Sequence, residues 1–307
     1  MQTYDVLVAG DYCLDLIFTG LPELPRLGAE VIGAGFEMLP GGAYNAVAAL
    51  HRLGLRVGWA GDFGNDDFSR FVLAAAASEG LDQALFVHHD RPLRKVTVAL
   101  SYPEDRAFVA FYDPDPPLPA VMRALAAVRA KALYVPGLYA GVLLEGAARL
   151  ARGRGLRLAM DGNASEGRTL AEPSIRRALS LLDVFLPNAA EACQMAQVRE
   201  VVTACRLLAE ICRLVVIKDG PNGALACRQG EILRDPALPI QPLDTTGAGD
   251  CFNAGFLCAW LEGQDLPTCL RWGNIVGGLS TLGHGGTGQR VTRAEVGALL
   301  AQGTTTA

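Results

Sequence analysis

A glycine-rich segment in the last third of the chain has the residue types needed to handle a phosphoryl group. Residues Asp244–Asp250 read Asp-Thr-Thr-Gly-Ala-Gly-Asp, and an apolar run that predicts a buried helix follows. Gly247 and Gly249 let the backbone turn tightly, so that its N–H groups face one point. The free N–H groups and partial positive charge at a helix start favour an anion there. Asp250, in the first turn, is expected to accept a proton from an attacking hydroxyl.

Two other interpretations of this segment compete with phosphoryl transfer. An aspartate that caps a helix after a glycine turn is common and needs no catalysis. A dinucleotide-binding loop, which would indicate an oxidoreductase, needs a third glycine where this chain has Phe252. No Gly-x-x-x-x-Gly-Lys-Ser/Thr sequence occurs in the chain. We therefore expect backbone amides and a helix dipole, without a P-loop lysine, to hold the phosphate.

Two segments near the N-terminus carry groups that could bind hydroxyls. Gly41 and Gly42 stand at the entry of a predicted helix, where they permit close approach by a ligand, and Asn45 can donate and accept hydrogen bonds. Asp11 and Asp15 follow the first predicted strand, and carboxylates accept two hydroxyl donors from a polyol. The alternatives are a plain glycine turn with a solvent-facing asparagine, and an aspartate that caps a turn.

Two further segments lie at predicted strand ends. Asn188 and Glu191 begin a helix and share one of its faces, so that their oxygens could hold a hydrated Mg²⁺ near phosphates. The same pair could instead form a capping box. The turn Lys218–Gly223 follows the last long predicted strand and could pass beneath a nucleotide, or could be only a hairpin turn.

Most of the chain alternates short apolar strands with helices, which predicts an α/β fold with a mostly parallel sheet covered on both faces. Ligands of such sheets gather at the carboxyl ends of the strands. The predicted strands are 4–9, 57–60, 132–135, 156–161, 184–186 and 214–218. The predicted helices are 43–53, 66–79, 142–152, 173–181, 189–196, 201–211, 248–261 and 266–282.

Residues 14–39 and 94–112 break this rhythm with strand-like alternation punctuated by proline, glycine and acidic residues. They predict a small accessory sheet that projects from the core, with a pair of surface hairpins as the alternative. No linker or repeat divides the chain, so residues 1–307 are expected to form one domain with these two segments inserted.

The composition excludes several classes of protein. Half of the 307 residues are hydrophobic, which is enough for a large core, and the net charge of −5 argues against a general nucleic-acid binder. The eight cysteines form no Cys-x-x-Cys pair, which indicates reduced thiols in a cytoplasmic protein. No signal peptide, membrane span or histidine metal-ligand spacing is present, so no membrane partner is expected.

Taken in order, Gly-Gly-x-x-Asn, Asn-x-x-Glu, Lys-Asp-Gly-x-x-Gly and Asp-Thr-Thr-Gly-Ala-Gly-Asp make the chain resemble the ribokinase-like (PfkB-type) carbohydrate kinases over almost its whole length. The resemblance implies a three-layer αβα core with a β-sheet lid, and MgATP-dependent phosphorylation of a sugar hydroxyl. Asp250 would be the base, and the amides of Gly247, Ala248 and Gly249 the anion hole. Mg²⁺ would be organised by Asn188 and Glu191, and the sugar held by Asp11, Asp15, Gly41, Gly42 and Asn45.

The resemblance also assigns the remaining sites. Backbone groups of Asp244 and Thr246 would bind a monovalent cation, usually K⁺. Residues 14–39 and 94–112 would be the lid, through which two subunits of a homodimer often pair. The adenine would lie near Lys218–Gly223 and Gly283–Gly288, so the nucleotide-binding residues expected are Lys218, Gly220, Gly223, Asn274 and Gly285.

Departures from the family pattern concern the acceptor. The glycine motif Gly-Gly-Ala-Tyr-Asn is one residue shorter than that of ribokinases, and Cys13 stands where ribokinases have a ribose-binding Asn. Tyr12 and Tyr44 are candidates to stack on a sugar or a nucleobase, so a nucleoside kinase is the alternative. A catalytically silent ligand-binding member is a further alternative, although it is expected to lack the base or the glycines.

The small-sheet segments also lack the Tyr-x-Arg pattern of ketodeoxygluconate kinases, whose acidic substrate needs a cation. Arg94, Lys95 and Arg106 are the candidates to supply one.

Overall fold

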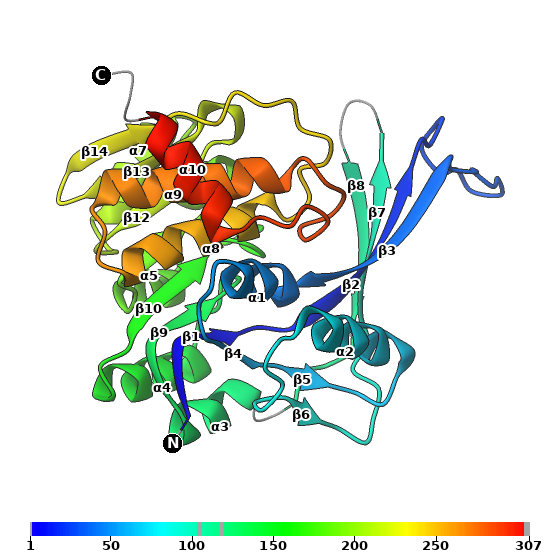
Figure 1. Cartoon of the computed structure of the whole chain (residues 1–307), viewed down its shortest axis with the longest axis horizontal. Helices are drawn as coiled ribbons and strands as arrows, with labels where there is room; N and C mark the ends of the chain where they lie inside the picture. Colours follow the sequence, from blue (N-terminus) through cyan, green and yellow to red (C-terminus); the bar gives the residue numbers. More distant parts are fainter. Residues whose placement is uncertain (1, 103–105, 117–118, 304–307) are drawn as a thin grey trace.

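The structure is a computed structural model that describes residues 2–102, 106–116 and 119–303. Helices cover both faces of a large sheet, and a smaller sheet projects from one end (Figure 1). The large sheet has eight strands in the order β14-β13-β12-β11-β10-β9-β1-β4. These strands are β1 (Thr3–Ala9), β4 (Val57–Ala60), β9 (Arg129–Val135), β10 (Arg157–Asp161), β11 (Val184–Leu186), β12 (Val215–Lys218), β13 (Ala224–Arg228) and β14 (Glu231–Asp235).

Alternate side chains of β1 enter opposite hydrophobic clusters, as expected for a strand that is buried on both faces. Val6 and Val8 belong to one cluster and Leu7 to the other. The first cluster is covered by α1 (Ala43–Arg52), α2 (Asp67–Glu79), α8 (Ala248–Leu261), α9 (Leu266–Ser280) and α10 (Arg293–Gly303). The second is covered by α3 (Ala120–Ala127), α4 (Val142–Gly153), α5 (Pro173–Ser180), α6 (Ala189–Ala196) and α7 (Val201–Ala209). The predicted three-layer αβα fold is confirmed.

The strand order reverses at β1, which pairs in parallel with β4 on one side and with β9 on the other. The helix α1 precedes β4 and lies on one face, whereas α4 follows β9 and lies on the other. Connections that diverge in this way leave a crevice beyond the carboxyl ends of the strands. Asp11, Asp161, Asn188 and Lys218 all lie at or just after such strand ends.

The small sheet has the strand order β3-β2-β7-β8 and projects from one end of the core, with α1 and α2 packed at its base (Figure 1). Its strands are β2 (Tyr12–Thr19), β3 (Gly35–Gly42), β7 (Lys95–Ser101) and β8 (Arg106–Tyr112). A separate small sheet was predicted from residues 14–39 and 94–112 and is confirmed, although residues 103–105 lie outside the described part. A separate two-stranded sheet pairs β5 (Asp62–Phe63) with β6 (Val87–His88).

Several elements were not predicted from the sequence. The strands β13 and β14 form an antiparallel hairpin that extends the large sheet beyond β12, so residues 214–218 are not the last core strand. Short runs such as Ala224–Arg228 have few of the β-branched residues that mark strands, and their pairing comes from the neighbouring strand. The helices α3 and α10 were also missed. Among the described helices, none combines the length and apolar character that crossing a bilayer requires.

Candidate active site

The turn before α8 is built so that only glycine fits. Gly247 caps the helix with φ of 70°, a left-handed conformation. A methyl group on Gly247 would clash with the Cα atom of Gly286 and lie 3.0 Å from Nδ2 of Asn45. Ala248, Gly249 and Asp250 then form the first turn of α8. The segment predicted to bind an anion is therefore a helix N-terminus packed closely against a second glycine-rich loop, and its role stays a prediction.

Asp250 lies in that first turn and accepts a hydrogen bond of 3.1 Å from Nδ2 of Asn45. Burial and the negative charge of Asp161 raise the pKa of Asp250 to about 7, against the opposing effects of Asn45 and Lys218. A group with a pKa near the working pH has a substantial fraction of its carboxylate form available and still takes up a proton readily. The environment of Asp250 therefore suits a general base.

Asp161 was not among the predicted site residues, yet it is the centre of a buried polar network. Its Oδ1 accepts hydrogen bonds from Nζ of Lys218 at 2.7 Å and from the amide of Gly162 at 2.7 Å. Its Oδ2 accepts from Nδ2 of Asn253 at 2.9 Å, and the same amide group is 2.9 Å from the Tyr134 hydroxyl. The sequence signal was a carboxylate at the end of a predicted strand, the same signal that identified Asp11.

Asn188 and Glu191 form the capping box of α6, which the sequence offered as the alternative to a magnesium site. The Asn188 side chain accepts from the amide of Glu191 at 2.8 Å, and Glu191 Oε2 accepts from the amide of Asn188 at 2.8 Å. Glu191 also lies close to Gly162, the residue that follows Asp161. A methyl group added at Gly162 would be only 2.5 Å from Oε2 of Glu191. Burial and the charge of Asp161 raise the pKa of Glu191.

A cavity of about 590 Å³ opens beside the first turn of α8. Four of the five predicted nucleotide-binding residues, Lys218, Gly220, Gly223 and Asn274, line it together with Ala248 and Gly249 of the anion turn. Gly285 does not line it; its amide donates to Asp244 Oδ2 at 2.8 Å. Gly285 thus supports the loop before the helix.

The predicted hydroxyl-binding residues gather on the other side of Asp250. Asp15 lies directly over Gly41, where any side chain would clash with its carboxylate. Gly42 has φ of 63° and begins the entry to α1. Burial raises the pKa of Asp15 to about 6. Oδ1 of Asn45 is buried without a hydrogen-bond partner among the described residues, which leaves one unsatisfied acceptor on the side chain that binds Asp250.

The three cations proposed to bind an acidic substrate all have partners within the protein. Arg94 Nε donates to Asp113 at 2.9 Å. Lys95 bridges Asp11, at 2.5 Å, and Asp115. Because carboxylates already balance their charges, Arg94 and Lys95 are poor candidates to bind an acidic substrate.

Arg106 reaches from β8 to the loop that precedes α8. Its Nη1 contacts Asp244 Oδ1 at 3.4 Å and Thr246 Oγ1, and its Nη2 donates to Thr245 Oγ1 at 3.0 Å. The small sheet and the anion turn are therefore connected by a guanidinium, at the two residues where a monovalent cation was expected. Asp244 has a lowered pKa because backbone amides, Thr246 and Arg106 outweigh its burial.

Tyr12 and Tyr44 do not face the site, which corrects the expectation that they stack on an acceptor. Tyr12 is 1% exposed, stacks on Phe63 at 5.2 Å between ring centroids and donates to the Leu93 carbonyl at 2.6 Å. Tyr44 is 4% exposed. Strand alternation explains the error for Tyr12, since it lies on the face of β2 opposite to Cys13 and Asp15.

Comparison with known proteins identifies the family of the chain. A sequence profile described as pfkB family carbohydrate kinase matches residues 5–293. This chain belongs to that family. The kinase is 28% identical over 302 residues to ribokinase from Bacillus subtilis (strain 168), an alignment that covers 96% of this chain and 99% of that protein. Membership makes it an ATP-dependent phosphotransferase whose acceptor is an alcohol group of a sugar or a nucleoside.

Solved structures share the fold of the kinase across nearly its whole length. Arabidopsis thaliana ribokinase complexed with ribose and ATP superposes with a TM-score of 0.81 at 20% identity, covering 98% of this chain and 99% of that one. A nucleoside kinase from Burkholderia thailandensis in complex with inosine superposes with a TM-score of 0.74 at 21% identity, covering 97% and 98%. One fold therefore serves both acceptor classes.

Proposed function

We propose that the kinase transfers the γ-phosphoryl group of ATP to a hydroxyl of a neutral sugar or nucleoside, with Asp250 as the general base. The observation that carries this proposal is the carboxylate of Asp250, with a pKa of about 7, in the first turn of α8 beside a cavity of about 590 Å³. The acceptor hydroxyl donates its proton to Asp250 as its oxygen attacks phosphorus, and ADP leaves on the opposite side.

Charge on the transferred group is stabilised by the amides of Gly247, Ala248 and Gly249 and by the dipole of α8. Asn45 holds the Asp250 carboxylate through its amide group and keeps its buried carbonyl oxygen for the acceptor. Asp15, Gly41 and Gly42 provide the remaining surface for the acceptor. We propose that the small sheet acts as the lid over this surface, in one domain formed by residues 1–307.

Magnesium fits the polar edge beside Asp250. Glu191 and Asp161 are close enough for the charge of Asp161 to raise the pKa of Glu191, and a divalent cation would relieve this repulsion. We propose that Asn188, Glu191 and Asp161 hold the hydrated ion, whose bound form would neutralise phosphate charge. No cluster of three or more His, Cys, Asp or Glu side chains suited to a metal is found among the described residues, in keeping with an ion held partly by substrate.

Potassium fits less well. The expected ligands are backbone groups of Asp244 and Thr246, and Arg106 places a positive charge beside both residues, which opposes a second cation there. We therefore assign no step of the transfer to a monovalent cation and expect Arg106 to reduce the need for one.

Two further properties are proposed. The outer face of the small sheet carries exposed apolar side chains, which supports a homodimer formed through this sheet. They are Phe36, Met38, Val109 and Phe111.

All eight cysteines are free thiols and most are buried, which supports a reducing, cytoplasmic location.

An acceptor screen tests the proposed function. ATP consumption is measured with Mg²⁺ and K⁺ present and with ribose, fructose, ketodeoxygluconate, adenosine or cytidine added. We expect turnover with a neutral acceptor and none with ketodeoxygluconate, because Arg94 and Lys95 are paired with protein carboxylates. A protein that binds ATP and acceptors but transfers no phosphoryl group would be a silent member of the family.

A further inference from the structure

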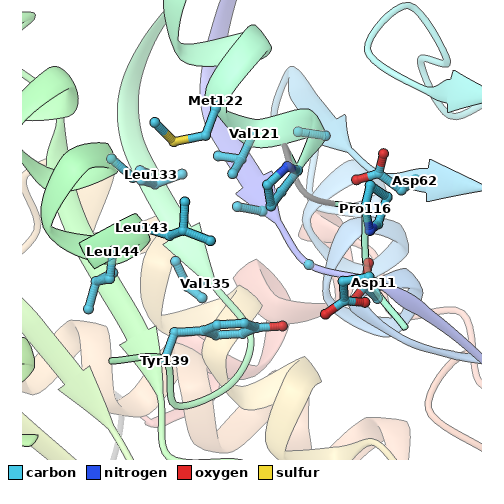
Figure 2. Close-up of a pocket in the computed structure, with 16 residues that line it drawn as sticks. Asp11, Asp62, Pro116, Val121, Met122, Leu133, Val135, Tyr139, Leu143 and Leu144 are labelled. Carbon is cyan, nitrogen blue, oxygen red and sulfur yellow. The ribbon is translucent and has the colours of Figure 1, made fainter. Parts of the chain in front are cut away.

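A second cavity, of about 170 Å³, lies between α3, α4 and the end of β9 and has no part in the transfer just described (Figure 2). Apolar side chains gather on one side of it, whereas Asp11 and Asp62 stand on the other (Figure 2). The apolar wall consists of Val121, Met122, Leu133, Val135, Leu143 and Leu144. The cavity is therefore apolar in depth and acidic at its rim.

This cavity adjoins the acceptor side of the site. It lies at the reversal of strand order, where Ala9 ends β1 and Val135 ends β9. Asp11 comes just before β2 and Asp15 lies within it, so this strand leads from the cavity to Asp15. Asp15 is in turn close enough to Asp250 for its charge to raise the pKa of Asp250. A molecule with its reactive hydroxyl at Asp250 can thus pass Asp15 and reach the cavity at Asp11.

The volume limits what can enter. An apolar cavity of roughly 150 Å³ accommodates one benzene ring. The cavity of about 170 Å³ therefore matches a single six-membered ring in size better than a fused two-ring system. Tyr139 lines the cavity, with its hydroxyl directed toward Asp11 (Figure 2).

The rim selects for hydrogen-bond donors. Asp11 and Asp115 share the single ammonium of Lys95, so the rim keeps an excess of negative charge. Asp62 is occupied structurally, since it binds Nε2 of His89 at 2.7 Å and accepts from the amide of Ala120 at 2.9 Å. A carboxylate accepts hydrogen bonds from an amino group, such as that at position 4 of cytosine, and repels a carbonyl oxygen in its place.

We propose that this cavity receives the base of a nucleoside acceptor, a single ring that carries an amino group, so that the kinase prefers an aminopyrimidine nucleoside to a free sugar. The inference rests on the proposed transfer at Asp250, because it assumes that the sugar hydroxyl of the same molecule lies there. Cytidine is the probe of choice, with uridine, adenosine and ribose as comparisons.

The decisive variant fills the cavity from its mouth. Leu143 lines it, whereas the adjacent Val142 does not and is 85% exposed. We expect Leu143→Trp to lower kcat/KM for cytidine at least tenfold and to leave kcat/KM for ribose within twofold. Val142→Trp should leave both unchanged. Because both positions are exposed by half or more, the variants are expected to fold, which their thermal midpoints will verify.

Calorimetric titration of cytidine and ribose without nucleotide separates this inference from the proposed function. Tight cytidine binding that Leu143→Trp weakens tenfold supports the cavity, even if no phosphoryl transfer follows. If ribose binds as tightly as cytidine, or if Leu143→Trp changes neither binding nor turnover of cytidine, the inference is wrong.

The role of the acidic rim has its own test. Asp115→Asn should reduce the preference for cytidine over uridine severalfold, while Asp67→Asn, which alters an exposed ion pair with Arg70, should not. A preference for uridine or adenosine in the unmodified kinase would overturn the assignment of an aminopyrimidine.

Discussion

We call the cavity beside α8 the nucleotide cavity and the cavity behind Asp11 the acceptor cavity, after the ligands that we propose for them; the two are built from different parts of the chain. The nucleotide cavity, of about 590 Å³, is bounded largely by glycine, proline and small side chains, so that backbone groups face the ligand. The acceptor cavity, of about 170 Å³, is bounded by large aliphatic side chains and by carboxylates. Backbone amides suit the phosphates of ATP, the substrate that kinases of this family have in common. Side chains can be exchanged singly, so the acceptor side is where a kinase of this fold can acquire its own specificity.

The largest effect is expected at Asp250, in the first turn of α8. Asp250→Asn should fold and should lower kcat by about 10²–10⁴-fold, the usual contribution of a general base. Steady-state kinetics of the purified variant, with the exposed Asp67→Asn as control, measure this loss. Near wild-type turnover would remove Asp250 from the mechanism, whereas loss of ATP binding as well would indicate a structural role.

The backbone character of the nucleotide side is tested by Gly247→Ala. Its methyl group would clash with Gly286 in a left-handed conformation, so the anion turn must shift. We expect kcat to fall about 100-fold, comparable to the loss of an oxyanion-hole donor. Gly263→Ala is the matched control, because Gly263 has φ of 78° with no atom within 4 Å of the added methyl group. Both variants bear the backbone strain, but only Gly247→Ala should lose activity.

A smaller effect is expected where the small sheet meets the anion turn. Arg106→Gln should lower kcat/KM about tenfold, since the loop at Asp244 and Thr246 loses its cation. It should also make activity depend more strongly on K⁺ than in the unmodified kinase. Rates in potassium and in choline salts measure both changes. Arg94→Gln, which breaks an ion pair elsewhere on the same sheet, should show no such cation dependence.

The smallest effect concerns pH. Because the pKa of Asp250 is about 7, kcat/KM should fall as the pH decreases below 7 and the base becomes protonated. The charge of Asp161 raises this pKa, so Asp161→Asn should move the acidic limb of the profile to lower pH. A pH profile of each protein gives the two limbs directly. A limb that stays in place in Asp161→Asn would mean that another group titrates.

Much of the fold was predictable because local patterns carry it. Alternating strands and helices indicated the αβα layers, and the period-two pattern of residues 94–112 indicated the small sheet. The hairpin of β13 and β14 was missed, because Ala224–Arg228 has weak strand propensity and pairs through its neighbours. Asp161 was missed for a related reason, since its importance comes from Lys218 and Asn253, which are 57 and 92 residues away in sequence.

By itself, the sequence determined the phosphate chemistry of this kinase. A tight turn, a helix start and a carboxylate three residues after Gly247 are local features, so the role that we propose for Gly247–Asp250 can be predicted without knowledge of distant residues. Only the tertiary structure decided which side chains face the acceptor. In the folded chain Tyr12 and Tyr44 are buried, and Lys95 forms ion pairs with two carboxylates. The cavity behind Asp11 also exists only in the folded chain. The physical reason is that an anion turn forms from consecutive residues, whereas a side-chain cavity forms only when separate elements pack together.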